Sequence, residues 1–160
     1  MKSLKKILAV LLSATLIFAV FAGCSAKKDD SKVGIIQYMP HSSLDNCTQG
    51  LKNALDKEGI AYEVQIGSSG SADADCQSYA EQMASGGYDL IIAVATPAAL
   101  SAYSAVKNSG NSIPVIFCAV SDPVGPGLVK SMEKPENNCT GTSDAFDIAG
   151  QVKLIKQIQP

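Results

Sequence analysis

The sequence predicts an α/β fold built on an open, doubly wound parallel sheet. Short apolar runs alternate along the chain with segments in which apolar residues recur every three or four positions. Two of the runs, 89–95 (DLIIAVA) and 114–120 (PVIFCAV), show no polar alternation, as expected of strands covered on both faces. The length of 160 residues, 46% of them apolar, allows about one domain of ordinary size.

The first strand and the helix after it are predicted from the segment that ends at Gly59. The run 32–38 (KVGIIQY) predicts a strand, and Gly59 stops the helix that follows. Ser42 and Asp45 stand three residues apart, which is the spacing of a capping box at the helix start. Residues at helical spacing, three of them leucines, form the inner face of this helix: Leu44, Thr48, Leu51 and Leu55.

A second strand–helix pair follows. Residues 62–67 (YEVQIG) alternate as a strand does, and a Gly/Ser loop occupies 68–72. Either Asp73 or Asp75 is placed to cap the next helix, and Gly86-Gly87 ends it. The predicted inner face of this helix consists of Cys76, Tyr79, Ala80 and Met83.

The second half of the chain continues the alternation. After the strand 89–95, Thr96-Pro97 gives an N-cap and a proline where a missing N–H does no harm. The helix that they open has one apolar stripe: Ala99, Ala102, Tyr103 and Val106. After the strand 114–120 we expect, in order, a turn-rich loop at 121–127, a short element at 128–132, a brief extended crossing at 138–143 and a last helix at 148–158. The last helix presents one face: Ile148, Val152, Ile155 and Gln159.

The first 23 residues are predicted to be a signal peptide and not part of the fold. Residues 1–6 carry three lysines, and 7–22 are almost continuously apolar. The segment 21–24 (FAGC) resembles a bacterial lipobox, which implies cleavage before Cys24 and diacylglycerol on its sulfur. Residues 24–31 are then a tether, and the protein is exported and anchored on the outer face of the bacterial cell membrane. The alternative is an uncleaved anchor helix.

Composition excludes several classes of partner and cofactor. The chain has no Arg, and from Cys24 onward ten lysines face fifteen acidic residues, so a nucleic-acid-binding surface is excluded. The single His41 cannot build a multi-histidine metal site, so we expect no metal. Residues 67–71 (GSSGS) lack the lysine and the spacing of a P-loop and the third glycine of a dinucleotide fingerprint, and we expect no cofactor.

Beyond Cys24, four cysteines remain, and we predict that all four are free thiols: Cys47, Cys76, Cys118 and Cys139. No CxxC motif is present, and Cys118 lies inside an apolar run. Disulfides in an exported protein stay open as the alternative, with three possible pairings.

Candidate binding residues follow three predicted strands. In an open α/β sheet, ligands bind beyond the carboxyl ends of the strands, where helix N-termini present free N–H groups. Hydroxyl or acidic residues with a proline occur there in 38–43 (YMPHSS), 95–98 (ATPA) and 120–123 (VSDP). Hydroxyls and amides suit a carboxylate, whereas Asp122 suits an ammonium group. Tyr38 is the aromatic residue at this edge. The alternative is that these are ordinary caps and turns.

The same loop also allows a second interpretation, that the protein is a hydrolase. His41 lies beside Ser42 and Ser43, the residue types of a nucleophile and its base. Neighbours in a loop rarely point at one another, and no G-x-S-x-G motif is present. We therefore expect no catalytic residue.

Several motifs in fixed order resemble one family over residues 32–160. They are KVGIIQYMPHSSLD, YDLIIAVATPAA, IPVIFCAVSDPVGPGLV, NCTGTSD and LIKQIQP. Together they closely resemble substrate-binding lipoproteins of ABC importers of the TrpX type. The resemblance implies a type I periplasmic binding protein, whose two lobes close on a ligand between them. It also implies an aromatic amino acid (Trp, Tyr or Phe) as ligand and ABC permease subunits as partners.

The resemblance also carries over site residues and domain limits. It matches the chain to a first ligand-binding lobe (32–139), then a hinge crossing and the first helix of an absent second lobe (140–160), so the chain looks truncated. It implies ligand-binding positions at Tyr38, Ser42, Ser43, Thr96, Pro97, Ala98, Ser121, Asp122 and Asp144. Ser42, Ser43 and Thr96 are assigned to the carboxylate, and Asp122, ahead of Asp144, to the ammonium group.

Capture of a solute, not chemistry, is the expected function. With one lobe present, we expect residues 24–160 to bind an aromatic amino acid far more weakly than a two-lobed protein would. A non-functional fragment, a ligand-sensing module and a small extracellular hydrolase using Ser42 and His41 are the alternatives.

Overall fold

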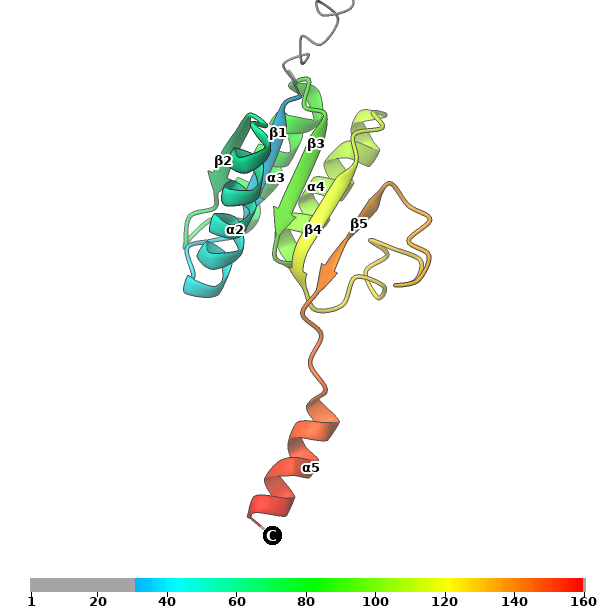
Figure 1. The fold of residues 1–160 in the computed structure, drawn as a ribbon. Coiled ribbons are helices and arrows are strands. Elements are labelled where there is room, and N and C mark those ends of the chain that lie inside the picture. The colour runs from blue at the N-terminus through cyan, green and yellow to red at the C-terminus, as the bar shows by residue number, and fades with distance from the viewer. Residues whose placement is uncertain (1–30, 160) are drawn as a thin grey trace, which may run out of the picture.

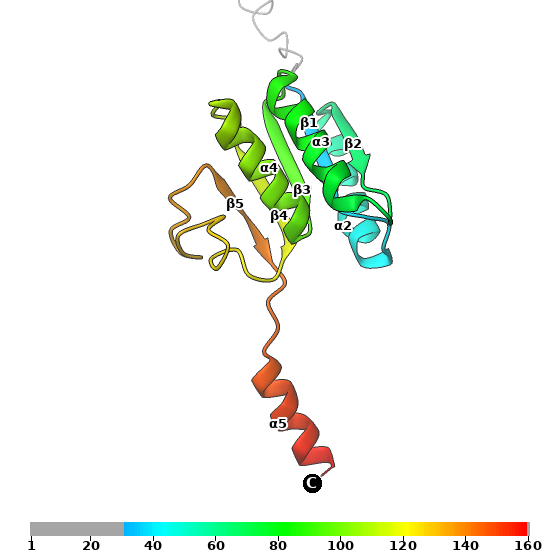
Figure 2. The same cartoon turned by 180° about the vertical axis from the view of Figure 1, so that it is seen from behind.

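In the computed structural model, residues 31–159 are described, and within them five parallel strands form one sheet in the order β2-β1-β3-β4-β5. The strands are β1 (Val33–Gln37), β2 (Tyr62–Ile66), β3 (Leu90–Val94), β4 (Val115–Val120) and β5 (Cys139–Ser143). The helices are α2 (Ser42–Glu58), α3 (Ala72–Ser85), α4 (Thr96–Ser109) and α5 (Ile148–Ile158). Helix α2 covers one face of the sheet, and α3 and α4 cover the other (Figures 1 and 2). The predicted doubly wound parallel sheet is therefore confirmed, while the predicted signal peptide and the tether, except Ser31, lie outside the described residues.

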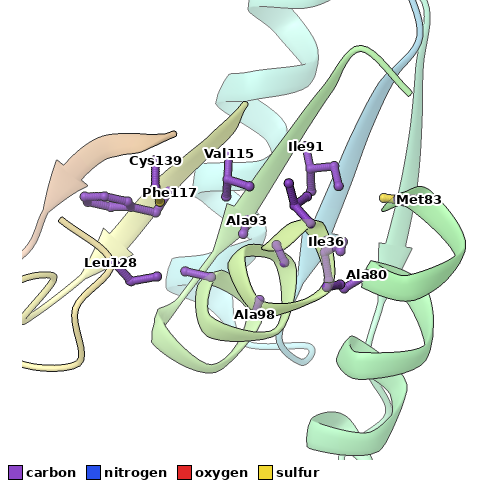
Figure 3. Close-up of a cluster of buried hydrophobic side chains, with 14 of the residues drawn as sticks. Ile36, Ala80, Met83, Ile91, Ala93, Ala98, Val115, Phe117, Leu128 and Cys139 are labelled. Atoms are coloured by element: carbon purple, nitrogen blue, oxygen red, sulfur yellow. The ribbon is translucent and has the colours of Figure 1, made fainter. Parts of the chain in front are cut away.

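The larger core lies between the sheet and the pair α3 and α4. Alanines on both helices let their backbones approach the sheet closely, and larger side chains from the strands fill the space between them (Figure 3). Phe117, at the middle of β4, is 1% exposed and is the largest fully buried side chain among the described residues. The core side chains of this face include Ile36, Ala80, Met83, Ile91, Ala98, Val115 and Phe117.

The opposite face is covered by α2, with the inner stripe that the sequence predicts. Leu44, Leu51 and Leu55 pack over a buried cluster from β1 and β3. Thr48, the one polar member of the stripe, is 5% exposed, and its Oγ1 donates a hydrogen bond of 2.6 Å to Oε1 of Gln37. A polar pair therefore sits inside an otherwise apolar helix–sheet interface, and it is fully hydrogen-bonded, as burial requires.

The helix starts differ from the predictions. His41 is the N-cap of α2, and its Nδ1 accepts a hydrogen bond from the Ser43 amide at 3.3 Å, so Ser42 is the first helical residue. Asp45 does not complete a capping box, because its carboxylate accepts from the Gln37 side chain instead. A donor from the preceding strand thus replaces the capping interaction that spacing alone suggested.

The other two predicted caps are also wrong in detail. Ser71 stands at the N-cap position of α3, and the carboxylate of Asp75 binds the preceding turn through the Ser68 amide (2.8 Å) and the Ser71 hydroxyl (3.0 Å). That bond to the Ser68 amide is the main reason why the pKa of Asp75 lies below its ordinary value. Ala95 is the N-cap of α4, and Thr96 is already its first residue.

The crossing expected at 138–143 is a fifth strand. Residues 139–143 (CTGTS) lack the apolar character of the other strands, yet β5 pairs in parallel with β4, with Cys139 opposite Val115 and Gly141 opposite Phe117. A Cβ at Gly141 would lie 2.0 Å from the carbonyl oxygen of Phe117, so this close approach requires glycine. The short element expected at 128–132 is neither helix nor strand; it is a turn closed by bonds such as Lys130 N to Pro135 O (2.9 Å).

Helix α5 has the predicted bounds but contacts little of the rest of the described chain. It follows β5 and lies apart from the sheet, beyond the carboxyl ends of the strands (Figure 1). None of its residues is buried, and its apolar arc is open: Ile148, Val152, Leu154, Ile155 and Ile158. Neither α5 nor any other helix within residues 31–159 is long and apolar enough to cross a membrane.

The buried cysteines are expected to resist alkylation. Cys76 and Cys139 are 0% and 2% exposed, and burial is the main cause that raises the pKa of each thiol to about 11. Because the thiolate is the reactive form, iodoacetamide at pH 8 should modify both slowly in the folded protein and fast in guanidinium. Mass spectrometry of tryptic peptides measures this. Equal rates in the folded and unfolded protein would contradict the burial of these two thiols.

Candidate functional site

The predicted binding loops all lie at one edge of the sheet. Because the five strands are parallel, their carboxyl ends meet there (Figure 1). Backbone hydrogen bonds join neighbouring ends. Tyr38 N donates to Val94 O at 3.2 Å, Ala95 N to Cys118 O at 2.9 Å and Asp144 N to Val120 O at 3.3 Å. We call this the carboxyl edge; it carries residues 38–43, 95–98, 121–122 and 144.

The loop after β1 ends at the N-terminus of α2. Ser42 and Ser43 are exposed in the first turn of the helix, where backbone N–H groups lack intrahelical partners and the helix dipole is positive. The Nδ1 atom of His41 accepts a hydrogen bond from the backbone amide of Ser43, at the helix end. The imidazole therefore binds a backbone N–H group here and not a serine hydroxyl. This arrangement suits the binding of an anion.

The junction of β3 and α4 brings a second helix N-terminus to the carboxyl edge. Thr96 and Pro97 are half-buried, but Ala98 is fully buried in the core, so only its backbone can face a ligand. Ala95 has φ 82° and ψ 157°, and Ala119, near the end of the neighbouring strand, has φ 56°. Such backbone conformations are costly for alanine and cluster at functional sites. The sequence gives no signal for either of them.

The ends of β4 and β5 place two carboxylates in different surroundings. Oδ1 of Asp122 accepts from the amides of Val124 (3.1 Å) and Gly125 (2.8 Å), so this side chain folds back on its own loop. Oδ1 of Asp144 accepts from the Ser121 hydroxyl at 2.9 Å. Ser121 and Asp144 therefore form one hydrogen-bonded pair across the ends of two strands, and both are exposed.

Tyr38 is half-buried at the end of β1. Burial is the main cause that raises the pKa of its phenol, and the carboxylate of Asp73 adds to the effect. Asp73 belongs to the first turn of α3, so it reaches the carboxyl edge from a third helix. The sequence suggested Asp73 only as a cap, because nothing in a linear pattern shows that it meets Tyr38.

Two other features bear on chemistry. A cavity of about 480 Å³ lined by Tyr88, Asp89, Asn111 and Pro114, among others, lies at the amino ends of β3 and β4, on the opposite side from the predicted site. It is lined by loop ends and holds none of the predicted binding residues. Among residues 31–159, no three His, Cys, Asp or Glu side chains are grouped to hold a metal ion.

Comparisons with known proteins point to one family. The profile of the family described as ABC transporter substrate binding protein matches residues 32–160. The Tyrosine-binding protein of Clostridioides difficile is 37% identical over an alignment of 174 positions, and the alignment covers 98% of this chain.

Two solved structures are similar in both fold and sequence. One is an ABC domain in complex with L-Trp from Streptococcus pneumonia, with a TM-score of 0.69 and 35% identity over 80% of this chain. The other is a ligand-free, open substrate-binding protein with adhesive properties from Clostridium difficile, with a TM-score of 0.67 and 37% identity over 81% of this chain. The matches cover 49% of the Tyrosine-binding protein and 43% and 44% of the two solved chains, so this chain spans about half the length of each.

Proposed function

The chain belongs to the ABC transporter substrate-binding protein family, and from this premise we propose that it captures an aromatic amino acid at the carboxyl edge. The observation that carries the proposal is that one edge of the sheet gathers hydroxyl groups, two helix N-termini and a carboxylate. A zwitterion offers the complementary charges. The relatives named for tyrosine and bound to L-Trp support an aromatic side chain on that zwitterion.

The carboxylate of the ligand is assigned to the starts of α2 and α4. Ser42 and Ser43 supply hydroxyls at the first helix, and Thr96 supplies one at the second. Both helix ends also offer backbone N–H groups and the positive end of the dipole, which together favour an anion. Pro97 lacks an N–H, so at α4 the amides of Thr96 and Ala98 remain for this purpose.

The ammonium group is assigned to Asp144 ahead of Asp122, the reverse of the order expected from the resemblance. Asp122 already binds two amides of its own loop, and a Cβ placed on Gly125 would lie 2.3 Å from its Oδ2. The Asp144 carboxylate accepts one hydrogen bond, from the Ser121 hydroxyl, and the residue stands at the point where the chain leaves the sheet. Tyr38 is the aromatic contact for the ligand ring on this side.

The proposed mechanism is capture by closure, without catalysis. In a two-lobed binding protein, a ligand that contacts both lobes stabilises the closed form, and a permease can distinguish that form from the open one. This chain supplies one wall and, through residues 140–147, the first crossing toward a second. The exposed apolar arc of α5 is the surface that we expect a second lobe to cover.

The proposed location is the outer face of a bacterial membrane. Residues 1–23 are a signal peptide in this proposal, and diacylglycerol on Cys24 is the anchor. The described domain begins only a few residues beyond that cysteine, so it would stay close to a membrane-bound permease.

Ligand-observed NMR tests the proposal on the chain as it stands. We expect the resonances of L-tryptophan and L-tyrosine to broaden with millimolar dissociation constants, because one wall buries about half of the contact surface that a small ligand needs. N-acetyl-L-tryptophanamide, which keeps the indole but lacks both charges, should broaden much less.

A matched pair of variants separates the site from unspecific contact. Replacing Ser42 and Ser43 together with alanine should abolish most of the broadening, whereas Ser104→Ala, an exposed serine of α4 away from its first turn, should not change it. Equal broadening by the uncharged analogue, or by the Ser42/Ser43 variant, would contradict the assigned carboxylate site.

A further inference from the structure

We propose that Gln37 is a positioning residue that holds the ligand loop 38–43 in its binding conformation. The inference rests on the proposed function, because the loop it positions carries Ser42 and Ser43. Gln37 is the last residue of β1, directly before that loop. It does not reach the carboxyl edge itself, and it acts through the segment that does.

The side chain of Gln37 is fully buried and satisfies three hydrogen-bonding groups. Its Oε1 accepts from the Thr48 hydroxyl at 2.6 Å. Its Nε2 donates to the carbonyl oxygen of Met39 at 2.8 Å and to Oδ1 of Asp45 at 2.7 Å. One amide therefore joins the start of the loop, the first turn of α2 and the second turn of α2 to the end of an interior strand.

These bonds fix the loop at both of its ends. Met39 lies within the loop, and Asp45 is the residue whose backbone N–H binds His41 O at 2.8 Å to close the first turn of the helix. With both ends held by one rigid amide, the loop and the N-terminus of α2 keep one geometry relative to the sheet. A buried amide that loses partners pays a desolvation cost, so alternative loop conformations are disfavoured.

The chemistry of the residue matters as much as its size. The side chain at position 37 must accept a hydrogen bond from the Thr48 hydroxyl and donate two, one to a backbone carbonyl oxygen and one to a carboxylate oxygen. A neutral amide has one acceptor oxygen and two N–H donors in the same group. Asp45 is exposed, so its carboxylate stays hydrated while the amide orients it near the positive end of α2. A methionine at position 37 has similar volume and removes all three hydrogen bonds.

The test compares Gln37→Met with Gln65→Met. Gln65 lies on the neighbouring strand β2, pairs with Ile36 in register and also donates to a carboxylate (Glu63, 2.8 Å), and its side-chain hydrogen bond does not involve the loop. Gln37→Met takes the acceptor away from the buried Thr48 hydroxyl, which lowers stability, but the variant should still fold because the exposed Asp45 carboxylate can turn to water. We expect the amide proton of Asp45 to exchange about tenfold faster with solvent, the factor that loss of one charge-assisted hydrogen bond implies. The broadening of the L-tryptophan resonances should fall by at least half, which corresponds to at least about a twofold loss of binding. Gln65→Met should change neither.

A second pair keeps the test independent of any folding defect in Gln37→Met. Asp45→Ala removes one link from an exposed residue, and Asp45→Asn keeps the acceptor oxygen, so the alanine variant should show the faster exchange and the asparagine variant should restore the slow rate. The positioning role would be overturned if Gln37→Met left both the exchange rate of the Asp45 amide and the broadening of L-tryptophan unchanged. A lower melting temperature of Gln37→Met, with that rate and that broadening unchanged, would overturn it too. If the wild-type chain broadens no L-tryptophan, the proposed function fails, and the exchange rates still decide whether Gln37 holds the loop.

Discussion

Joining this lobe to a second one is expected to tighten aromatic amino acid binding from millimolar to micromolar or better. The chain spans 49% of the Tyrosine-binding protein that it resembles, and we expect the remaining half of that relative to supply the second wall of the site. Burying the other face of a small ligand supplies the missing contacts, and a thousandfold gain corresponds to about 4 kcal/mol. The same addition gives α5 a surface to pack on.

The measurement is calorimetric titration of a chimera that continues residue 160 with the unmatched half of the Clostridioides difficile relative. L-tyrosine should bind about a thousandfold more tightly than to the single lobe, a gain of about 4 kcal/mol. The chimera carrying Ser42→Ala and Ser43→Ala is the control, because it has both lobes but lacks two assigned contacts. Micromolar binding by the single lobe, or equal affinity of lobe and chimera, would contradict the two-wall account.

Replacing Phe117 with alanine is expected to remove a large share of the protein's folding stability. Phe117 is 1% exposed at the centre of β4, and its backbone meets Gly141 of β5, so its removal opens a cavity beside two strands (Figure 3). Such a truncation costs about 3–5 kcal/mol, against a total stability of about 5–15 kcal/mol for a domain.

Urea denaturation followed by circular dichroism measures this loss. Phe146→Ala is the matched control, because Phe146 is 68% exposed in the segment between β5 and α5 and its removal should change stability by less than about 0.5 kcal/mol. Similar midpoints for the two variants would show that Phe117 does not carry the core.

The first four strands of the sheet could be predicted from the sequence, most clearly the central ones, which are unbroken apolar runs. Runs such as 89–95 and 114–120 are apolar throughout, as strands buried on both faces must be, and the helices between them have regular inner stripes. Strand β5 has no such signal: its pairing with β4 depends on a glycine that lets two backbones meet, and that is a property of the tertiary structure. The helix caps failed for the same reason, since Asp45 and Asp75 bind groups outside their own first turns.

The candidate site was predictable as a place but not as a set of contacts. Parallel strands bring Ser42, Thr96 and Ser121 to one edge, so the topology alone locates them. The roles of Asp122 and Asp144 depend on which oxygens are already occupied, and only the folded loops show that. Ala98 is another example. Its side chain is buried in the core and only its backbone amide can face a ligand, and the sequence does not show which of the two groups is accessible.

Mapping the amide shifts of the 15N-labelled lobe during titration with L-tryptophan tests the central claim most directly. We predict that the largest shifts fall on Ser42, Ser43, Thr96, Ser121 and Asp144, all at the carboxyl edge. Shifts concentrated instead at Tyr88, Asp89 and Asn111, around the cavity at the opposite edge, would contradict it.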